Sequence, residues 1–143
     1  MKISSRETVE PITVHQTVRV YPLLKRWDLA EQTKGTYLEF IDDFEIDPGS
    51  KAEPHFHNTH EWYFVVEGRG VVQIENEACR VAPGALVYIP PNQRHTIYPT
   101  GEGKIRALCF AASYQPVGGK FYTPVELKAV APVDEASAHQ AGV

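Results

Sequence analysis

The sequence consists of short runs of β-branched and aromatic residues separated by glycine and proline. Its 11 prolines and 10 glycines fall between these runs, and several runs alternate apolar with polar residues. Alternation with a period of two is the pattern of a strand with one buried face, and regularly spaced turns favour antiparallel pairing. We therefore expect one all-β, antiparallel domain, either a sandwich or a barrel.

The same pattern divides the 143 residues into three parts. Residues 1–35 form an N-terminal arm, in which residues 13–21 are expected to add an extra strand. Residues 36–128 form the barrel, with a last strand near its end. Residues 129–143 are expected to be a flexible tail. A short helix at residues 26–34 is the only helical candidate.

Composition narrows the class of protein. The formal net charge is −4, which argues against a nucleic-acid partner or an anionic membrane. No run approaches the ~18 apolar residues that a membrane span needs, and the first residues lack a signal-peptide pattern. We expect a cytoplasmic protein in which Cys79 and Cys109 are free thiols.

Histidines gather in one part of the chain. His55, His57, His60 and Glu61 lie within seven residues, and His95 follows about one hairpin later. Imidazoles beside a carboxylate are the ligands of a divalent transition metal. The pattern predicts one such ion, with zinc favoured and Fe(II), manganese or nickel as alternatives.

Strand geometry places His55 and His57 on one side, because residues two apart share a face. Glu61 has the same parity, whereas His60 has the opposite parity unless a bulge at residues 58–59 turns it inward. The fourth protein ligand is therefore either Glu61 or His60. We expect His15 and His139 to be surface or core histidines rather than ligands.

These residues resemble the two motifs of the cupin superfamily, over residues 36–112. The first motif is matched at every position, by Gly49, His55, His57, Glu61 and Gly68. The second is matched by Gly84, Pro90 and His95, with Asn92 where glycine is usual and Pro99 where asparagine is frequent. The resemblance implies a single double-stranded β-helix, or jelly-roll barrel, that holds its metal inside and frequently pairs into a homodimer. We expect residues 13–21 to mediate that pairing.

Aromatic residues fall in or beside most of the expected strands, and Tyr63 shares the parity of Glu61. An apolar cavity above a metal suits a flat, hydrophobic ligand. The profile is similar to cupin-type cyclases of aromatic polyketides, and it implies an aldol-type cyclisation with Glu61 or Tyr63 assisting proton transfer. The alternatives are an Fe(II) dioxygenase acting on a phenol or diketone, and a non-enzymatic small-molecule-binding module.

Overall fold

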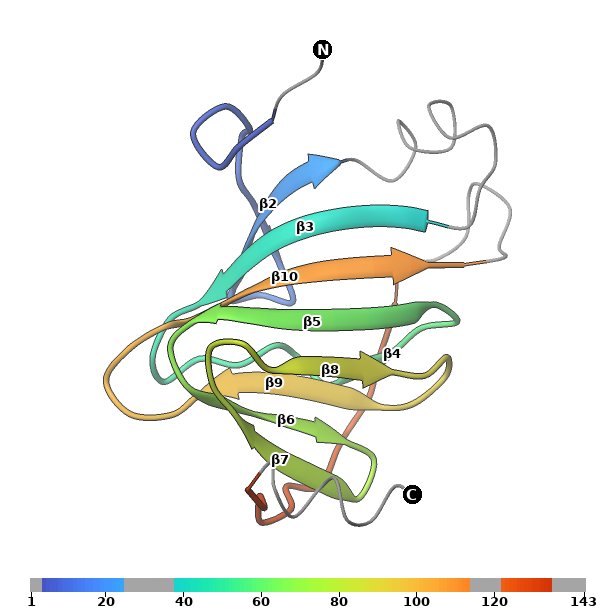
Figure 1. The fold of residues 1–143 in the computed structure, drawn as a ribbon. Coiled ribbons are helices and arrows are strands. Elements are labelled where there is room, and N and C mark those ends of the chain that lie inside the picture. Colours follow the sequence, from blue (N-terminus) through green and yellow to red (C-terminus); the bar gives the residue numbers. More distant parts are fainter. Residues whose placement is uncertain (1–3, 25–37, 114–121, 135–143) are drawn as a thin grey trace.

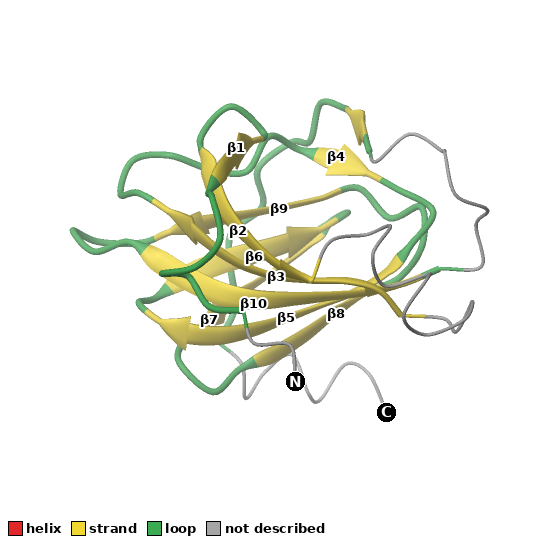
Figure 2. Cartoon of the chain, turned by 90° about the horizontal axis from the view of Figure 1, so that it is seen from above, coloured by secondary structure: helices red, strands yellow, loops and turns green. Residues whose placement is uncertain are grey.

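The computed structural model describes residues 4–24, 38–113 and 122–134 (Figure 1). All regular structure in these ranges is β-strand, which confirms the all-β prediction (Figure 2). The helix expected at residues 26–34 lies outside the described residues. The described part of the chain also contains no helix with the length and hydrophobicity to cross a bilayer.

The strands form two antiparallel sheets, which together make a jelly-roll sandwich. The six-stranded sheet has the order β1-β2-β3-β10-β5-β8 and the five-stranded sheet the order β11-β4-β9-β6-β7. In the first sheet the bounds are β1 Ile12–Val14, β2 Val18–Leu24, β3 Leu38–Ile46, β10 Ile105–Ala112, β5 His60–Glu67 and β8 Leu86–Ile89. In the second they are β11 Thr123–Pro124, β4 His55–Phe56, β9 His95–Pro99, β6 Gly70–Ile74 and β7 Glu77–Val81.

The core lies between the sheets and follows the alternation of the sequence. Along β10 each second residue is buried, namely Ile105, Ala107, Cys109 and Ala111. Along β5 the buried residues are Glu61, Tyr63 and Val65, while His60, Trp62 and Phe64 face outward. The parity of β5 therefore decides which of its side chains can reach the interior.

The hairpin between β5 and β6 requires glycine, as the Gly-Arg-Gly turn predicts. Gly68 has φ +79°, and a Cβ there would overlap the carbonyl oxygen of Lys104. A Cβ on Gly70 would lie 2.5 Å from the carbonyl oxygen of Tyr98. In both cases the glycine approaches the backbone beside the neighbouring strand of its own sheet, β10 for Gly68 and β9 for Gly70, so a side chain would push the chains apart.

The predicted extra strand at residues 13–21 is instead a hairpin, β1–β2, that extends the sheet beside β3. The chain reverses at His15 and Gln16, which have φ of 46° and 64°. The Thr17 amide donates to the His15 carbonyl oxygen at 2.8 Å and closes the turn. Non-glycine residues adopt this left-handed conformation infrequently, which is why the sequence does not signal the turn.

A strap of residues 4–9 crosses the outer face of β2 and β3. Arg6 donates to Asp43 at 3.1 Å and to Glu45 at 2.5 Å, and its guanidinium lies 4.0 Å from the centre of the Tyr21 ring. Arg19 also bonds Glu45. Asp43 and Glu45 are buried beneath these cations, so acidic residues on an outer face are here almost removed from solvent.

Residues 129–134 differ from the flexible tail expected from residue 129. The buried Gln73 side chain donates to the Lys128 carbonyl oxygen at 2.7 Å and accepts from the Val130 amide at 3.3 Å. Val133 then pairs with Cys79 in an isolated parallel bridge. The sequence of this segment has no hydrophobic periodicity, so its pattern does not predict these backbone hydrogen bonds.

Candidate metal centre and its cavity

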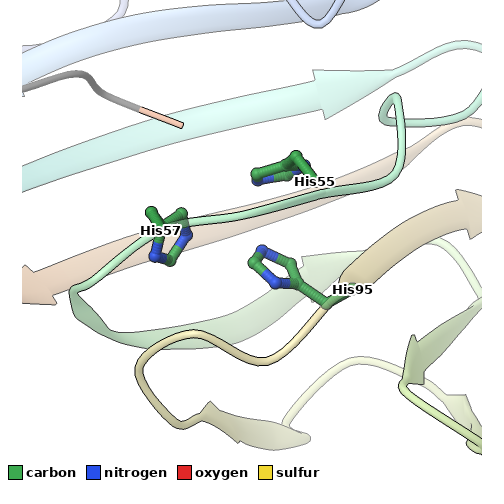
Figure 3. Close-up of side chains that lie close together, drawn as sticks. All are labelled: His55, His57 and His95. Carbon is green, nitrogen blue, oxygen red and sulfur yellow. The ribbon is translucent and has the colours of Figure 1, made fainter. Parts of the chain in front are cut away.

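Three histidines from neighbouring strands meet between the sheets (Figure 3). His55 begins β4, His57 follows it, and His95 begins β9, where it pairs directly with His55. One ring nitrogen of each lies within 4.8 Å of the others. The metal site therefore depends on the register between β4 and β9 as well as on the His-x-His spacing.

Two of the rings are oriented by backbone carbonyls. His55 Nδ1 donates to the Glu53 carbonyl oxygen at 2.7 Å, and His95 Nδ1 donates to the Gln93 carbonyl oxygen at 2.9 Å. These bonds leave each Nε2 free as a donor to a cation, and the buried His95 Nε2 has no hydrogen-bond partner. Burial, aided by His95 and His15, lowers the pKa of His55 to about 2, so its ring is neutral as a ligand requires.

Glu61 completes the group. Its Oε2 lies 3.0 Å from His57 Nε2 and 3.4 Å from His95 Nε2. Burial by itself would raise the pKa of Glu61, but the adjacent imidazoles of His57 and His95 outweigh burial and hold it well below its usual range. Three imidazoles and one carboxylate are a donor set that fits a divalent transition metal.

Two protic side chains surround the carboxylate. The Cys109 thiol donates to Glu61 Oε1 at 3.0 Å. Burial and then the negative charge of Glu61 raise the pKa of both Cys109 and Tyr63 well above their usual values. Both groups therefore keep their protons, and Tyr63 lies on the cavity wall beside Glu61 as its parity predicts.

His60 lies outside this group. Its Nδ1 bonds the hydroxyl of Tyr88 at 2.7 Å, and its ring is stacked with the rings of Trp62 and Tyr88. All three side chains lie on the outer face of the six-stranded sheet, because the chain enters β5 without the inward bulge that ligation by His60 needs. The geometry places Glu61, and not His60, beside the three histidines.

Asn92 stands where the second motif usually has glycine, and the structure explains why asparagine is tolerated there. Asn92 has φ 63°, a conformation that asparagine tolerates better than other side-chain-bearing residues. The backbone amide of Asn92 donates to the backbone carbonyl oxygen of His57 at 2.7 Å. Asparagine therefore replaces glycine without loss of the turn, and that turn supports a metal-site histidine.

His55, His57 and Glu61 lie on the wall of a cavity of about 350 Å³ between the sheets. Most of its wall is apolar, and the β1–β2 hairpin, β3 and β5 each contribute to it, with residues that include Val14, Val20, Phe40, Phe44 and Tyr63. Phe44 and Tyr63 meet edge to face, with ring centres 5.2 Å apart. A mainly apolar cavity with polar groups on one side is the usual form of a small-molecule site.

His15 is a cavity residue that sequence reasoning missed. Its ring stacks on the ring of His55, with ring centres 4.0 Å apart and ring planes at 23°. The ring of Tyr122 also lies against it, with ring centres 4.1 Å apart. Its Nδ1 is buried without a hydrogen-bond partner. Burial lowers the pKa of His15 to about 4, so the ring is neutral near pH 7. His15 reaches the cavity because the chain turns at residues 15–17, and this turn has no glycine that would predict it from the sequence.

Comparisons with known proteins agree with this fold. Residues 43–111 match the family model described as the cupin domain. The uncharacterized protein MJ1618 of Methanocaldococcus jannaschii is 41% identical over 69 residues, which cover 48% of this chain and 54% of that protein. The dimethylsulfoniopropionate lyase DddW of Ruegeria pomeroyi is 33% identical over 78 residues, which cover 54% of this chain and 51% of that protein. The matches thus span about half the length of these two curated relatives.

Among solved structures, the polyketide cyclase RemF of Streptomyces resistomycificus superposes with a TM-score of 0.70. The alignment covers 90% of this chain and 87% of RemF, at 22% sequence identity. At that identity the similarity shows the fold alone.

Proposed function

This chain belongs to the cupin family, and on that basis we propose that it is a metal-dependent cyclase of an aromatic polyketide intermediate, acting by aldol-type condensation. The observation that carries the proposal is the apolar cavity, which has His55, His57 and Glu61 on its wall and His95 next to them. Such a cavity suits a flat ligand that is largely hydrophobic and carries a few oxygens. The similarity in fold to a protein named as a polyketide cyclase supports the same reaction class.

His55, His57, His95 and Glu61 would hold the metal, which would supply a Lewis acid that polarises a ketone oxygen of the substrate. The apolar wall excludes water and restricts the substrate to folded conformations in which the reacting carbons meet. Because Glu61 is one of these ligands and its pKa lies well below the usual range, Tyr63, which keeps its proton beside Glu61, is the group placed to assist proton transfer at a carbon next to a ketone.

Zinc is favoured over the other ions when the site holds four imidazoles, which requires His60 as a ligand. Because His60 faces outward, the proposed ligands are three imidazoles and one carboxylate, a set that zinc, Fe(II), manganese and nickel all accept. Elemental analysis of the purified protein identifies the native ion.

A linear heptanetrione with single methylenes between its carbonyls is a suitable test substrate. Intramolecular condensation with loss of one water converts it to a dihydroxytoluene, which chromatography detects. We expect metal-loaded protein to accelerate this reaction without oxygen, and His57→Ala to lose both metal and activity. An absolute requirement for oxygen would rule out the cyclase, because aldol condensation consumes none.

An Fe(II) dioxygenase is the second candidate, and the position of Glu61 beside the histidines favours it. A carboxylate with imidazoles is a ligand set suited to iron that activates oxygen. An oxygen electrode with a panel of phenols and diketones tests it directly. Binding of these compounds without turnover, in air or under nitrogen, would instead indicate a binding module.

A further inference from the structure

Asp42 is an acidic residue on the cavity side of β3. Phe40, Asp42 and Phe44 alternate along this strand and all line the cavity. The next residue, Asp43, faces the opposite side and receives two hydrogen bonds from Arg106, at 2.9 and 2.6 Å. Two adjacent carboxylates therefore have opposite environments, one among cations and one among apolar side chains.

The half-buried side chain of Asp42 makes no hydrogen bond or ion pair with any residue in the described ranges. Its neighbour in register on β2 is Pro22, whose side chain has no polar atom. Its neighbour on β10 is Cys109, whose thiol is directed to Glu61. These two register neighbours supply no donor, and the carboxyl group has no hydrogen-bond partner among the residues that the structure describes.

An unpartnered carboxylate in such a place destabilises a fold, and an apolar side chain would pack there without that cost. Burial, followed by the negative charge of Glu61, raises the pKa of Asp42 to about 7. The group is therefore substantially protonated near neutral pH and carries a hydroxyl with no acceptor. A binding role explains why a costly side chain occupies this position.

Other titratable groups face the same space and are distinct from Asp42. They come from the β1–β2 hairpin, β4, β5, β10 and the segment before β11, namely His15, His55, His57, Glu61, Tyr63, Cys109 and Tyr122. Among them, His55, His57 and Glu61 belong to the candidate metal site, His15 stacks on His55, and Cys109 bonds Glu61. Asp42 is the carboxyl group of the wall that remains outside this network.

We propose that Asp42 donates a hydrogen bond to a ketone or phenol oxygen of the ligand, at a second polar contact separate from the metal. The inference rests on the proposed function and adds to it a requirement on the substrate. The ligand must be flat and apolar in its middle, with one oxygen for the metal and another for Asp42. A hydrocarbon-like end at this position would leave the carboxyl group unsatisfied.

The probe is 2,6-diacetylnaphthalene, a flat diketone with an apolar ring system between its two ketones, and binding is followed by its near-ultraviolet absorbance on metal-loaded protein. We expect Asp42→Leu to weaken binding about fivefold to tenfold at pH 6, the effect of one lost hydrogen bond. Asp42→Asn keeps a donor and should bind as the wild type does at pH 6. Wild-type affinity should fall as the pH rises to 8.5, whereas that of Asp42→Asn should change less.

Metal content is measured for every variant, so loss of the ion is distinguished from loss of the contact. A bound cation lowers the pKa of Asp42, so the midpoint of the wild-type profile is expected at or below pH 7. Equal affinity of wild type and Asp42→Leu at pH 6, or identical pH profiles of wild type and Asp42→Asn, would overturn the assignment while leaving the cyclase proposal intact. Failure of the wild type to bind the diketone at all would overturn both.

Discussion

His57 and Glu61 share a hydrogen bond of 3.0 Å between Nε2 and Oε2, across the turn that joins β4 to β5. Burial opposes protonation of His57, yet the bond and the charge of Glu61 outweigh burial and raise the pKa of His57. The same two atoms are the ones that a cation would bind, so metal and proton compete for this pair. Occupancy of the site should consequently fall in acid.

Metal content separates the roles of Glu61 and His60. Glu61→Ala should lower metal affinity by about tenfold or more, because it removes a donor next to the three imidazoles. His60→Ala is the matched control and should keep the wild-type metal content, since its ring is held by Tyr88 outside the site. Elemental analysis after dialysis measures both, and loss of metal in the His60 variant alone would contradict this assignment.

His15 should stabilise the cavity through its stack on His55. His15→Ala removes that contact and should lower the free energy of unfolding by about 1 kcal/mol. His15→Phe keeps a ring at the position and should recover most of the loss. Urea titration of the metal-free proteins measures the difference, and equal stability of wild type and His15→Ala would argue against the contact.

Glu45 should make the fold sensitive to acid. Arg6, Lys104 and Arg19 overcome the effect of burial and lower the pKa of Glu45 from 4.5 to about 2. Its contribution is complete above pH 4.5 and is lost as the pH falls toward 2, with a size of about 2 kcal/mol once the partly exposed cations are allowed for. Glu45→Gln should flatten this part of the stability profile.

The exposed Glu77 provides the control for that experiment, because Glu77→Gln should leave the acid limb of the profile unchanged. Chemical denaturation at several pH values between 2 and 6 gives the comparison. A Glu45 variant that keeps the full wild-type slope would show that other carboxylates dominate acid unfolding.

Asp42 should make the stability of the fold depend on pH in the opposite direction to Glu45. Its pKa is about 7 in the folded chain and 3.8 in the unfolded one, so the folded state binds more protons between these values. The stability of metal-free protein should therefore decrease as the pH rises from 4 to 7, by about 2–4 kcal/mol. Asp42→Asn should lose this decrease and be more stable than wild type at pH 8.

The predicted homodimer remains a prediction. β1 is an edge of the six-stranded sheet, and Ile12 on it is half exposed, so a second copy could extend the sheet there. Thr13→Pro should disrupt such pairing while β2 remains bonded to β3. Light scattering coupled to gel filtration measures the mass, and a monomeric wild type would refute the dimer.

Periodicity allowed much of the fold to be predicted. The inward direction of Tyr63 follows from alternation, because side chains two residues apart on a strand point to the same face. The same rule favours Glu61 over His60. The choice between Glu61 and His60 stayed open in the sequence, because a turn between two strands can change which residues of the second strand face inward. The local sequence does not reveal whether it does.

His15 and Asp42 were not predicted, for a different physical reason. Each reaches the cavity through contacts between segments far apart in the chain, and neither belongs to a spaced motif. His15 depends on two left-handed residues without glycine, and Asp42 has a neighbour, Asp43, with the same side chain. Which of two adjacent aspartates faces inward is decided by the register of β3 against β2 and β10.

That alternation along β3 also protects the chain against misfolding. A slip of one residue would carry Asp43 and Glu45 into the apolar interior and leave Arg6, Arg19 and Arg106 facing phenylalanine rings. Asp43 and Glu45 would then lie among apolar side chains, where the native strand has only the half-buried Asp42, and three cations would lose their partners. Mispaired forms of β3 are therefore penalised more heavily than the native strand, and the charge pattern selects the correct register.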